Sequence, residues 1–200
     1  MSTKRNSVYS TRNLTTMAIL TAISSILFLI EIPIALFYKL DFSNLPILLS
    51  TFSLGVVPGI ITLLLKAFIG LLHSSSQGIG ELADFLIGLS MIVPVGLIYQ
   101  RKKTRFNAIL GMVVGTFIAM IVGGLVNLYI MIPFYGAVFG MPVEQIVAMG
   151  QALVPQINSD LSFVMLITLP FNLLKFTALS IITALIYKPL APILHGNRYK

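Results

Sequence analysis

Cysteine and tryptophan are absent from the 200 residues, and acidic residues number only six. Without cysteine the chain has neither a disulfide framework nor a thiolate nucleophile. The two histidines, His73 and His195, are too few and too far apart in sequence for a zinc site. Charged residues make up 10% of the chain, whereas soluble domains have about 25%. We therefore expect only tails and short loops outside a membrane, with no metal site and no catalytic or nucleic-acid-binding domain.

Apolar residues dominate what is present. They make up 57% of the chain, and the mean hydropathy is +0.98, which is typical of an all-α integral membrane protein. The net charge of +7 then reports on membrane topology rather than on nucleic-acid binding. The first apolar run follows Lys4, Arg5 and Arg12 and is too long for the core of a signal peptide. We interpret it as a retained first helix.

The number of membrane crossings depends on one ambiguous stretch. A spanning helix needs about 20 mainly apolar residues, and four stretches qualify outright. A fifth, 45–72, is long enough for one tilted helix, but Pro58 followed by Gly59 is a strong helix breaker in its middle. Ten of the thirteen basic residues form three clusters, near the N-terminus, at 101–105 and near the C-terminus. If all three face the cytoplasm, an even number of crossings separates them, so the fifth stretch counts as two helices.

The sequence thus predicts one membrane domain over residues 1–200, with six transmembrane helices and both termini in the cytoplasm. The predicted helices are 14–37, 45–57, 58–73, 80–100, 107–138 and 161–187, and the predicted cytoplasmic tails are 1–13 and 188–200. The second helix, about 13 residues long, is too short to cross a hydrocarbon core of roughly 30 Å. Irregular backbone at that depth must line a cavity or be surrounded by protein. The polar loop 38–44 is therefore predicted to cover a cavity.

Five ionisable residues lie in or beside the predicted helices, where a charge is costly and by default marks a functional site. They are Glu31, Lys66, Glu81, Asp84 and Lys175. Lys66 is more simply explained as a structural residue that snorkels or pairs with an acid. Glu81 begins a predicted helix, where the helix dipole also favours a carboxylate. Capping and ligand binding both remain open for this residue.

Two buried amides accompany these charges. Asn172 and Lys175 are three residues apart and share one helical face, and Asn127 lies in the preceding predicted helix. With Glu81 they provide converging donors and acceptors without a reactive centre, which favours a polar ligand over catalysis. Bridging between helices is the alternative role for each asparagine. Gly78-Ile79-Gly80 is not followed by the Gly-Lys-Ser/Thr of a P-loop, so we predict no ATP hydrolysis by this chain and no enzyme activity.

Five features together resemble the substrate-binding S components of energy-coupling factor (ECF) vitamin transporters, over nearly the whole chain. They are the six-helix hydropathy, Ala18-x-x-x-Ala22, the loop Lys39-Leu40-Asp41-Phe42-Ser43-Asn44-Leu45-Pro46, the segment Gly80-Glu81-Leu82-Ala83-Asp84-Phe85-Leu86-Ile87-Gly88, and Pro170-Phe171-Asn172-Leu173-Leu174-Lys175. The alanine motif is common to the family, whereas the last two segments resemble its riboflavin-specific members.

The resemblance implies a protein of the bacterial plasma membrane that captures riboflavin outside the cell and has no energy source of its own. It implies as partners a transmembrane T component, on which Ala18 and Ala22 pack, and two ATP-binding-cassette (ABC) ATPases. By position it also implies a riboflavin site. The residues so assigned are Glu81, Asn127, Asn172 and Lys175, with Leu40, Asp41, Phe42 and Asn44 from the loop that covers the site. The aromatic residues expected near the flavin ring are Phe42, Phe85, Tyr129 and Phe171.

Three other functions remain open. An S component for thiamine, folate, pantothenate or biotin would keep the family and change the ligand, although one lysine with two asparagines fits a neutral flavin better. FMN and flavin analogues also remain open as ligands. A proton-coupled secondary transporter would use Glu81, Asp84 and Lys175 as relays. A structural subunit would use the buried polar groups only to bridge helices and would bind no small molecule.

Overall fold

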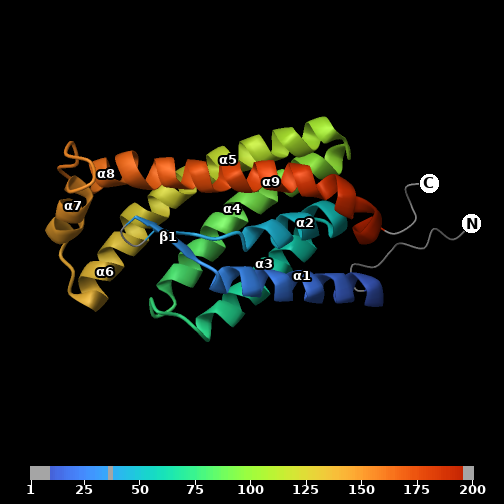
Figure 1. Ribbon diagram of the computed structural model, residues 1–200, viewed down its shortest axis with the longest axis horizontal. Helices are drawn as coiled ribbons and strands as arrows, with labels where there is room; N and C mark the ends of the chain where they lie inside the picture. The colour runs from blue at the N-terminus through green and yellow to red at the C-terminus, as the bar shows by residue number, and fades with distance from the viewer. Residues whose placement is uncertain (1–9, 36–37, 196–200) are drawn as a thin grey trace, which may run out of the picture.

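The structure, a computed structural model, describes residues 10–35 and 38–195, with residues 188–195 as backbone only. The helices run roughly along the long axis of the molecule (Figure 1), with α1 and α3 on one side, α5 and α9 on the other, and α2 and α4 between them. The elements are α1 (Thr11–Leu29), β1 (Ile32–Ala35), β2 (Tyr38–Leu40), α2 (Asn44–Leu54), α3 (Val56–Leu71), α4 (Ile79–Arg101), α5 (Arg105–Val126), the π-helix η1 (Asn127–Met131), α6 (Ile132–Phe139), α7 (Val143–Gln151), α8 (Asp160–Phe163), the π-helix η2 (Val164–Thr168) and α9 (Leu169–His195).

Four helical stretches among the described residues are long and apolar enough to cross a membrane. They are Thr11–Leu29, Ile79–Arg101, Arg105–Phe139 and Asp160–Tyr187. The ambiguous stretch of the sequence forms two shorter apolar helices, α2 with 11 residues and α3 with 16. They separate at Gly55, whose φ of 117° favours glycine, slightly before the predicted boundary. Pro58 lies in the first turn of α3, where its missing N–H is tolerated.

The prediction of a first helix over 14–37 is wrong beyond Leu29. Strands β1 and β2 form an antiparallel hairpin there, in which Ile32 pairs with Leu40 and Pro33 with Lys39. Pro33 has no N–H for a helix and favours an extended residue before it. The apolar run of the sequence therefore continues past the end of the helix. The expected all-α class omits this hairpin, which passes over the middle of the molecule (Figure 1).

Other predicted boundaries differ in smaller ways. The predicted helix 107–138 is a continuous helical stretch over Arg105–Phe139 that contains η1. The predicted helix 161–187 begins at Asp160, contains η2 and continues to His195, so the predicted tail at 188 starts as helix. The first helix begins at Thr11, and the remainder of both predicted tails, 1–9 and 196–200, lies outside the described residues.

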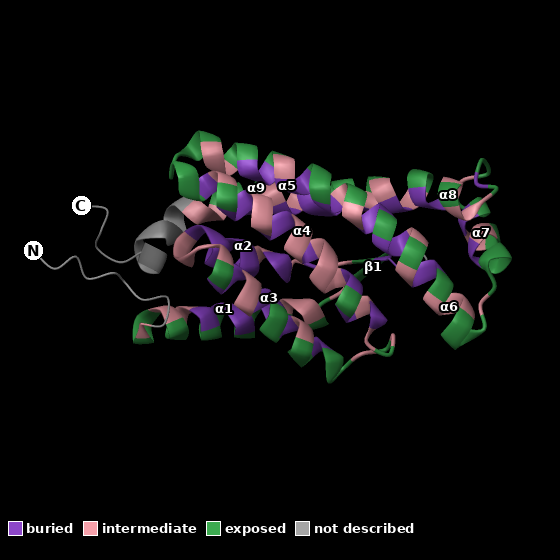
Figure 2. Cartoon of the chain, turned by 180° about the vertical axis from the view of Figure 1, so that it is seen from behind, coloured by how far each residue is buried: buried purple, intermediate pink, exposed green. Residues whose placement is uncertain are grey.

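The core and the outer surface are both apolar, as expected for a membrane protein. Ile47, Leu63 and Ile92, from three different helices, are fully buried. Buried residues face the inside of the bundle, and exposed residues lie along its outer faces (Figure 2). Many of those exposed residues are large and hydrophobic, including Ile23 on α1 and Phe117 on α5. Such a surface suits contact with lipid chains.

Candidate functional site

A cavity of about 360 Å³ lies beside the β1–β2 hairpin. Its size falls within the range of about 300–1,000 Å³ that is usual for small-molecule sites. Its wall combines aromatic rings with several polar and charged groups. The residues that line it are Phe28, Glu31, Tyr38, Lys39, Asp41, Ser75, Ser76, Gly80, Glu81, Ala83, Asp84, Ile87, Asn127, Met131, Tyr135, Phe139, Phe171, Asn172, Lys175 and Phe176. This mixture suits a planar ligand with a polar edge.

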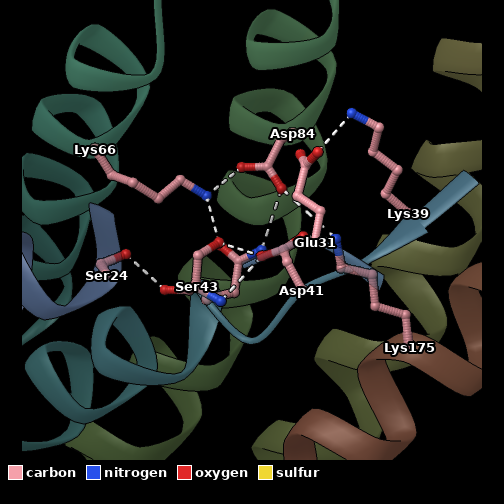
Figure 3. Close-up of polar contacts among 9 residues, drawn as sticks. Ser24, Glu31, Lys39, Asp41, Ser43, Lys66, Asp84 and Lys175 are labelled. Carbon is pink, nitrogen blue, oxygen red and sulfur yellow. Dashed lines mark hydrogen bonds and ion pairs between the residues drawn. The ribbon is translucent and has the colours of Figure 1, made fainter. Parts of the chain in front are cut away.

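Two lysines and two aspartates form a buried cluster at one side of the cavity (Figure 3). Lys175 Nζ lies 2.7 Å from Asp41 Oδ2 and 3.8 Å from Asp84 Oδ1. Lys66 donates to Asp84, and its side chain is only 1% exposed. The cluster draws its members from the loop before α2 and from α3, α4 and α9. Two positive and two negative charges therefore balance one another inside the bundle.

Hydrogen bonds from the loop before α2 complete the charged cluster. Ser43 donates its backbone N–H (2.9 Å) and its hydroxyl to Asp41 Oδ1, and the same hydroxyl accepts from Lys66 Nζ at 3.0 Å. Asn44 Nδ2 donates to Asp84 at 3.3 Å. Burial alone would raise the pKa of Asp41, but the charges of Lys175 and Lys66 and the hydrogen bonds from Lys175 and Ser43 hold that pKa below its usual value. Asp41 is therefore ionised at neutral pH.

The two amides predicted from the sequence both line the cavity, beside the two π-helices. Asn127 opens η1, and Thr168 closes η2. Tyr38 of the hairpin bridges them, since its hydroxyl donates to Asn127 Oδ1 at 3.1 Å and lies 2.5 Å from Thr168 Oγ1. Asn172 Nδ2 donates to the Thr168 carbonyl at 3.0 Å. π-Helical turns are frequent at functional sites, and here they bring both amides to the cavity.

Gly123 provides the surface on which the Asn172 amide rests. A Cβ atom at Gly123 would lie 2.6 Å from Asn172 Nδ2 and 2.8 Å from its Cγ. Those distances are shorter than real Cβ contacts, so any other residue at this position would force the amide to shift. The glycine thus helps to set the position of Asn172 in the cavity wall.

Glu81 lies in the first turn of α4 and also at the cavity wall. Its carboxylate accepts hydrogen bonds from Ser74 Oγ at 2.8 Å and Ser76 Oγ at 3.2 Å, both in the loop between α3 and α4. The helix dipole also favours a carboxylate at this end of α4. The two serine hydroxyls, and not Glu81, accept the N–H groups of Gly78 and Gly80 at the start of α4, so Glu81 supports that helix end through the serines and also lines the cavity.

The structure brings most of the predicted site residues together. Glu81, Asn127, Asn172, Lys175 and Asp41 all line the cavity. Leu40, Phe42 and Asn44 are not among the residues that line it; Leu40 and Phe42 are half-buried, whereas Asn44 is buried against Asp84. Of the four predicted loop residues, Asp41 lines the cavity and Asn44 contacts it indirectly through Asp84.

Only one of the four aromatic residues expected near the ligand lines the cavity. Phe171 does so and packs on Tyr38 at 4.8 Å between ring centroids. Tyr129 is 71% exposed, and Phe85 packs against the apolar core. Tyr129 lies inside η1, two residues after Asn127, and side chains two positions apart do not share a helix face. Because Asn127 lines the cavity, Tyr129 lies on the outer side of the helix.

Four residues that hold the amides or complete the charged cluster were not assigned to the site from the sequence. Tyr38 and Thr168 hold the amides, and Asp84 and Lys66 complete the charged cluster. Asp84 and Lys66 carried a signal, since both are ionisable residues within membrane helices. Tyr38 begins the loop predicted to cover a cavity, but its hydrogen bonds to the amides were not predicted, and Thr168 carried no signal because the π-helix that places it was not predicted.

The first helix presents the predicted alanine motif to the outside. Ala18 and Ala22 are exposed, whereas Met17, Leu20 and Thr21 of the same helix are buried. Within the described residues no group of three or more histidine, aspartate or glutamate side chains is placed to hold a metal ion.

Comparison with known families identifies the fold. A sequence profile described as the substrate-specific component of ECF transporters matches residues 12–187. The chain belongs to this family of S components. Its structure is also similar to that of the S component of a bacterial ECF transporter, with a TM-score of 0.71 and 32% identity over 90% of this chain and 96% of the other.

Several relatives of this S component have names that state a ligand. The riboflavin transporter RibU of Staphylococcus aureus is 31% identical over 90% of each chain. RibU of Streptococcus thermophilus is 32% identical over 92% of this chain and 85% of its own. The riboflavin transporter FmnP of Bacillus subtilis is 22% identical over 94% of this chain and 96% of its own. The S component fold and its likeness to riboflavin transporters therefore extend over nearly the whole chain.

Proposed function

We propose that this S component binds riboflavin in the cavity beside the β1–β2 hairpin and serves riboflavin uptake across the plasma membrane. The observation that carries the proposal is the convergence of Asn127, Asn172 and Lys175 with aromatic rings on one cavity of about 360 Å³. The names of the relatives at 31% and 32% identity support the same ligand. ATP hydrolysis is assigned to partner subunits.

The chemistry of the cavity suits a flavin. The isoalloxazine ring is planar and largely apolar, and its pyrimidine-dione edge alternates acceptors and donors. Phe171 and Tyr38 offer ring contacts worth about 0.5–1.5 kcal/mol each, and the two amides offer hydrogen bonds to the dione edge. Glu81, which accepts from Ser76 in the cavity wall, suits the ribityl hydroxyls.

The charge of the site favours riboflavin over anionic vitamins. The cluster of Asp41, Asp84, Lys66 and Lys175 is balanced within the protein, so it leaves no free positive charge for a carboxylate or a phosphate. Glu81 adds a negative charge to the wall. A folate or pantothenate carboxylate would lack a partner here, and burying an unpaired charge is costly. The phosphate of FMN faces the same difficulty unless it stays outside the cavity.

The proposed topology has six crossings, with α2 and α3 as two short ones and both termini in the cytoplasm. The start of α1, the turn between α4 and α5 and the end of α9 lie at the same end of the bundle in both views (Figures 1 and 2). These are the places next to the three basic clusters, and the positive-inside rule assigns that end to the cytoplasm. The proposed partners are a T component, which packs on Ala18 and Ala22, and two ABC ATPases.

The proposal is tested by purifying the protein in detergent from cells grown with riboflavin, denaturing it and recording the absorbance and fluorescence of the released small molecule. We expect about one flavin per chain and quenching of flavin fluorescence when riboflavin is added to ligand-free protein. Absence of both results would reject riboflavin. Uptake that follows the proton-motive force without the ATPase partners would instead support a secondary transporter.

A further inference from the structure

Tyr38 occupies a central position between the hairpin and the two π-helices. Its ring is held by Phe171 at 4.8 Å and Phe163 at 6.4 Å between centroids, and the residue is buried. Its hydroxyl reaches both Asn127 of η1 and Thr168 of η2. One hairpin residue thus contacts both places where the long helices depart from α-helical geometry.

The direction of the hydrogen bonds follows from the number of hydrogens. A phenolic hydroxyl carries one hydrogen, and Tyr38 donates it to Asn127 Oδ1. Toward Thr168 Oγ1 it must therefore accept. Burial raises the pKa of Tyr38 above its ordinary value, against the smaller effect of the Thr168 hydrogen bond, so the hydrogen is present throughout the physiological pH range. The chain of donation runs from Thr168 through Tyr38 to Asn127.

This series of hydrogen bonds determines which amide atoms remain for a ligand. Asn127 uses its oxygen to accept from Tyr38, which leaves its Nδ2 donor. Asn172 uses its Nδ2 to donate to the Thr168 carbonyl, and its amide face lies against Gly123, which leaves its Oδ1 acceptor on the opposite edge. Both residues line the cavity. The wall therefore offers a donor from one helix and an acceptor from the other.

We propose that Tyr38 is a positioning residue that sets this hydrogen-bond polarity, so that the wall recognises a ligand edge with a carbonyl oxygen next to an N–H, as in a cyclic imide. The proposal rests on the proposed function, because the imide edge of riboflavin supplies this pattern. Without the Tyr38 hydroxyl, the Asn127 amide is free to turn over and to present its oxygen to the ligand carbonyl. Two acceptors would then face each other, which is unfavourable.

The test compares riboflavin with analogues altered at single edge atoms, in wild type and Tyr38→Phe. 2-Thioriboflavin and 4-thioriboflavin each replace one carbonyl oxygen with sulfur, a weaker acceptor. One of these two oxygens is the proposed partner of Asn127 Nδ2. In the wild type, we expect one thio analogue to bind at least about fivefold more weakly than riboflavin. Riboflavin should bind to Tyr38→Phe about 5- to 30-fold more weakly than to wild type. The thio penalty, the loss of affinity of the thio analogue relative to riboflavin in the same protein, should fall below about twofold. Affinities come from competition against riboflavin fluorescence in detergent.

Three controls separate positioning from a general loss of structure. 3-Methylriboflavin lacks the N–H that is proposed to donate to Asn172. Its loss of affinity relative to riboflavin should be the same in Tyr38→Phe and wild type. Tyr99→Phe removes a different buried hydroxyl, which lies 3.0 Å from Tyr187 in the core, and should change no affinity. Thr168→Val and Thr168→Ser both leave the Tyr38 hydroxyl able to donate to Asn127 Oδ1, so both should keep the wild-type preference for riboflavin over the thio analogue.

The outcomes separate this inference from the proposed function. A thio penalty that persists unchanged in Tyr38→Phe would overturn the positioning role, because a merely structural change weakens all ligands by the same factor. A wild type that binds riboflavin without a penalty for either thio analogue would also overturn it. A wild type that does not bind riboflavin would overturn the proposed function and this inference together.

Discussion

Lys175 Nζ lies 2.7 Å from Asp41 Oδ2, although the two residues are 134 positions apart in the sequence. The contact joins α9 to the loop that leads from the hairpin into α2. Both residues also line the cavity. The position of that loop and the polar wall of the site therefore depend on the same ion pair.

Removing one member of this pair should be more harmful than removing both. Asp41→Asn leaves Lys175 with only Asp84, at 3.8 Å, and an unbalanced buried charge costs about 3–5 kcal/mol. We expect a loss of about 3 kcal/mol in the free energy of unfolding. The double change Asp41→Asn with Lys175→Gln removes both charges and should regain part of that loss. Chemical unfolding in detergent measures all three proteins.

The exposed ion pair of the hairpin is the matched control. Lys39 Nζ lies 2.5 Å from Glu31 Oε2, and the Lys39 side chain is 46% exposed. Exposed pairs contribute about 0–1 kcal/mol, so Lys39→Gln should leave the unfolding free energy nearly unchanged. If Asp41→Asn is as stable as Lys39→Gln, the cluster does not hold the loop in place.

The dependence of stability on pH provides an independent test of Asp41. Its pKa is lower in the folded protein than its ordinary value, so the carboxylate favours folding once it is ionised. That contribution is complete above the unfolded-state pKa of about 3.9, and it is lost as the pH falls toward the folded-state pKa. We expect the Asp41 contribution to stability to be constant from pH 8 to about 5 and to decline below about 4. The difference between wild type and Asp41→Asn, measured across this range, should shrink only at the acid end.

Gly123→Ala should weaken riboflavin binding through the Asn172 amide. The added Cβ would lie 2.6 Å from Asn172 Nδ2, so the amide must move away from the position in which it faces the cavity. We expect at least about a tenfold loss of affinity, the effect of one or two misplaced hydrogen bonds. Fluorescence titration with riboflavin measures this loss.

Gly136→Ala is the control for the glycine substitution. An added Cβ there would come no closer than 3.6 Å to another residue, an ordinary contact. This substitution should leave affinity unchanged and increase helix stability slightly, since alanine is favoured over glycine by up to about 1 kcal/mol. Equal losses in both variants would show that the Gly123 result reflects helix rigidity and not contact with Asn172.

The helices of this S component were largely predictable, because length and hydropathy identify membrane helices in a sequence. The break between α2 and α3 was predicted from Pro58 and from the distribution of basic residues, and it lies at Gly55. The end of α1 was not predictable from hydropathy alone, since the hairpin residues Ile32 and Ile34 are as apolar as the helix before them. Pro33 was the available signal for that end.

The predicted site residues that line the cavity are mostly those that are chemically unusual for their surroundings. Lys175, Asn172 and Glu81 are polar residues in apolar helices, and they line the cavity. The supporting contacts were not predictable in the same way. Tyr38 and Thr168 meet only because a hairpin crosses over two π-helices, and single-residue insertions of that kind leave no clear period in the sequence.

Ala18→Leu with Ala22→Leu should abolish transport while leaving riboflavin binding intact. Both alanines are exposed on α1, so larger side chains meet no neighbour within the S component. Small residues allow helices to approach closely in membranes, and two leucines would prevent the T component from doing so. We expect riboflavin affinity within about twofold of wild type and at least about a tenfold loss of uptake. Co-purification of the T component and uptake of labelled riboflavin in cells measure the two effects.

Ala184→Leu provides the matched control for the α1 substitution. Ala184 is an exposed alanine on α9, where it lines an apolar groove between α5 and α9 together with Ile109, Val113 and Ile181. A leucine there adds the same volume as each of the two α1 substitutions, on a surface that we assign to lipid, so assembly and uptake should stay within about twofold of wild type. If both substitutions reduce uptake equally, general crowding of the membrane surface explains the loss. If neither reduces it, the T component does not pack on this face of α1.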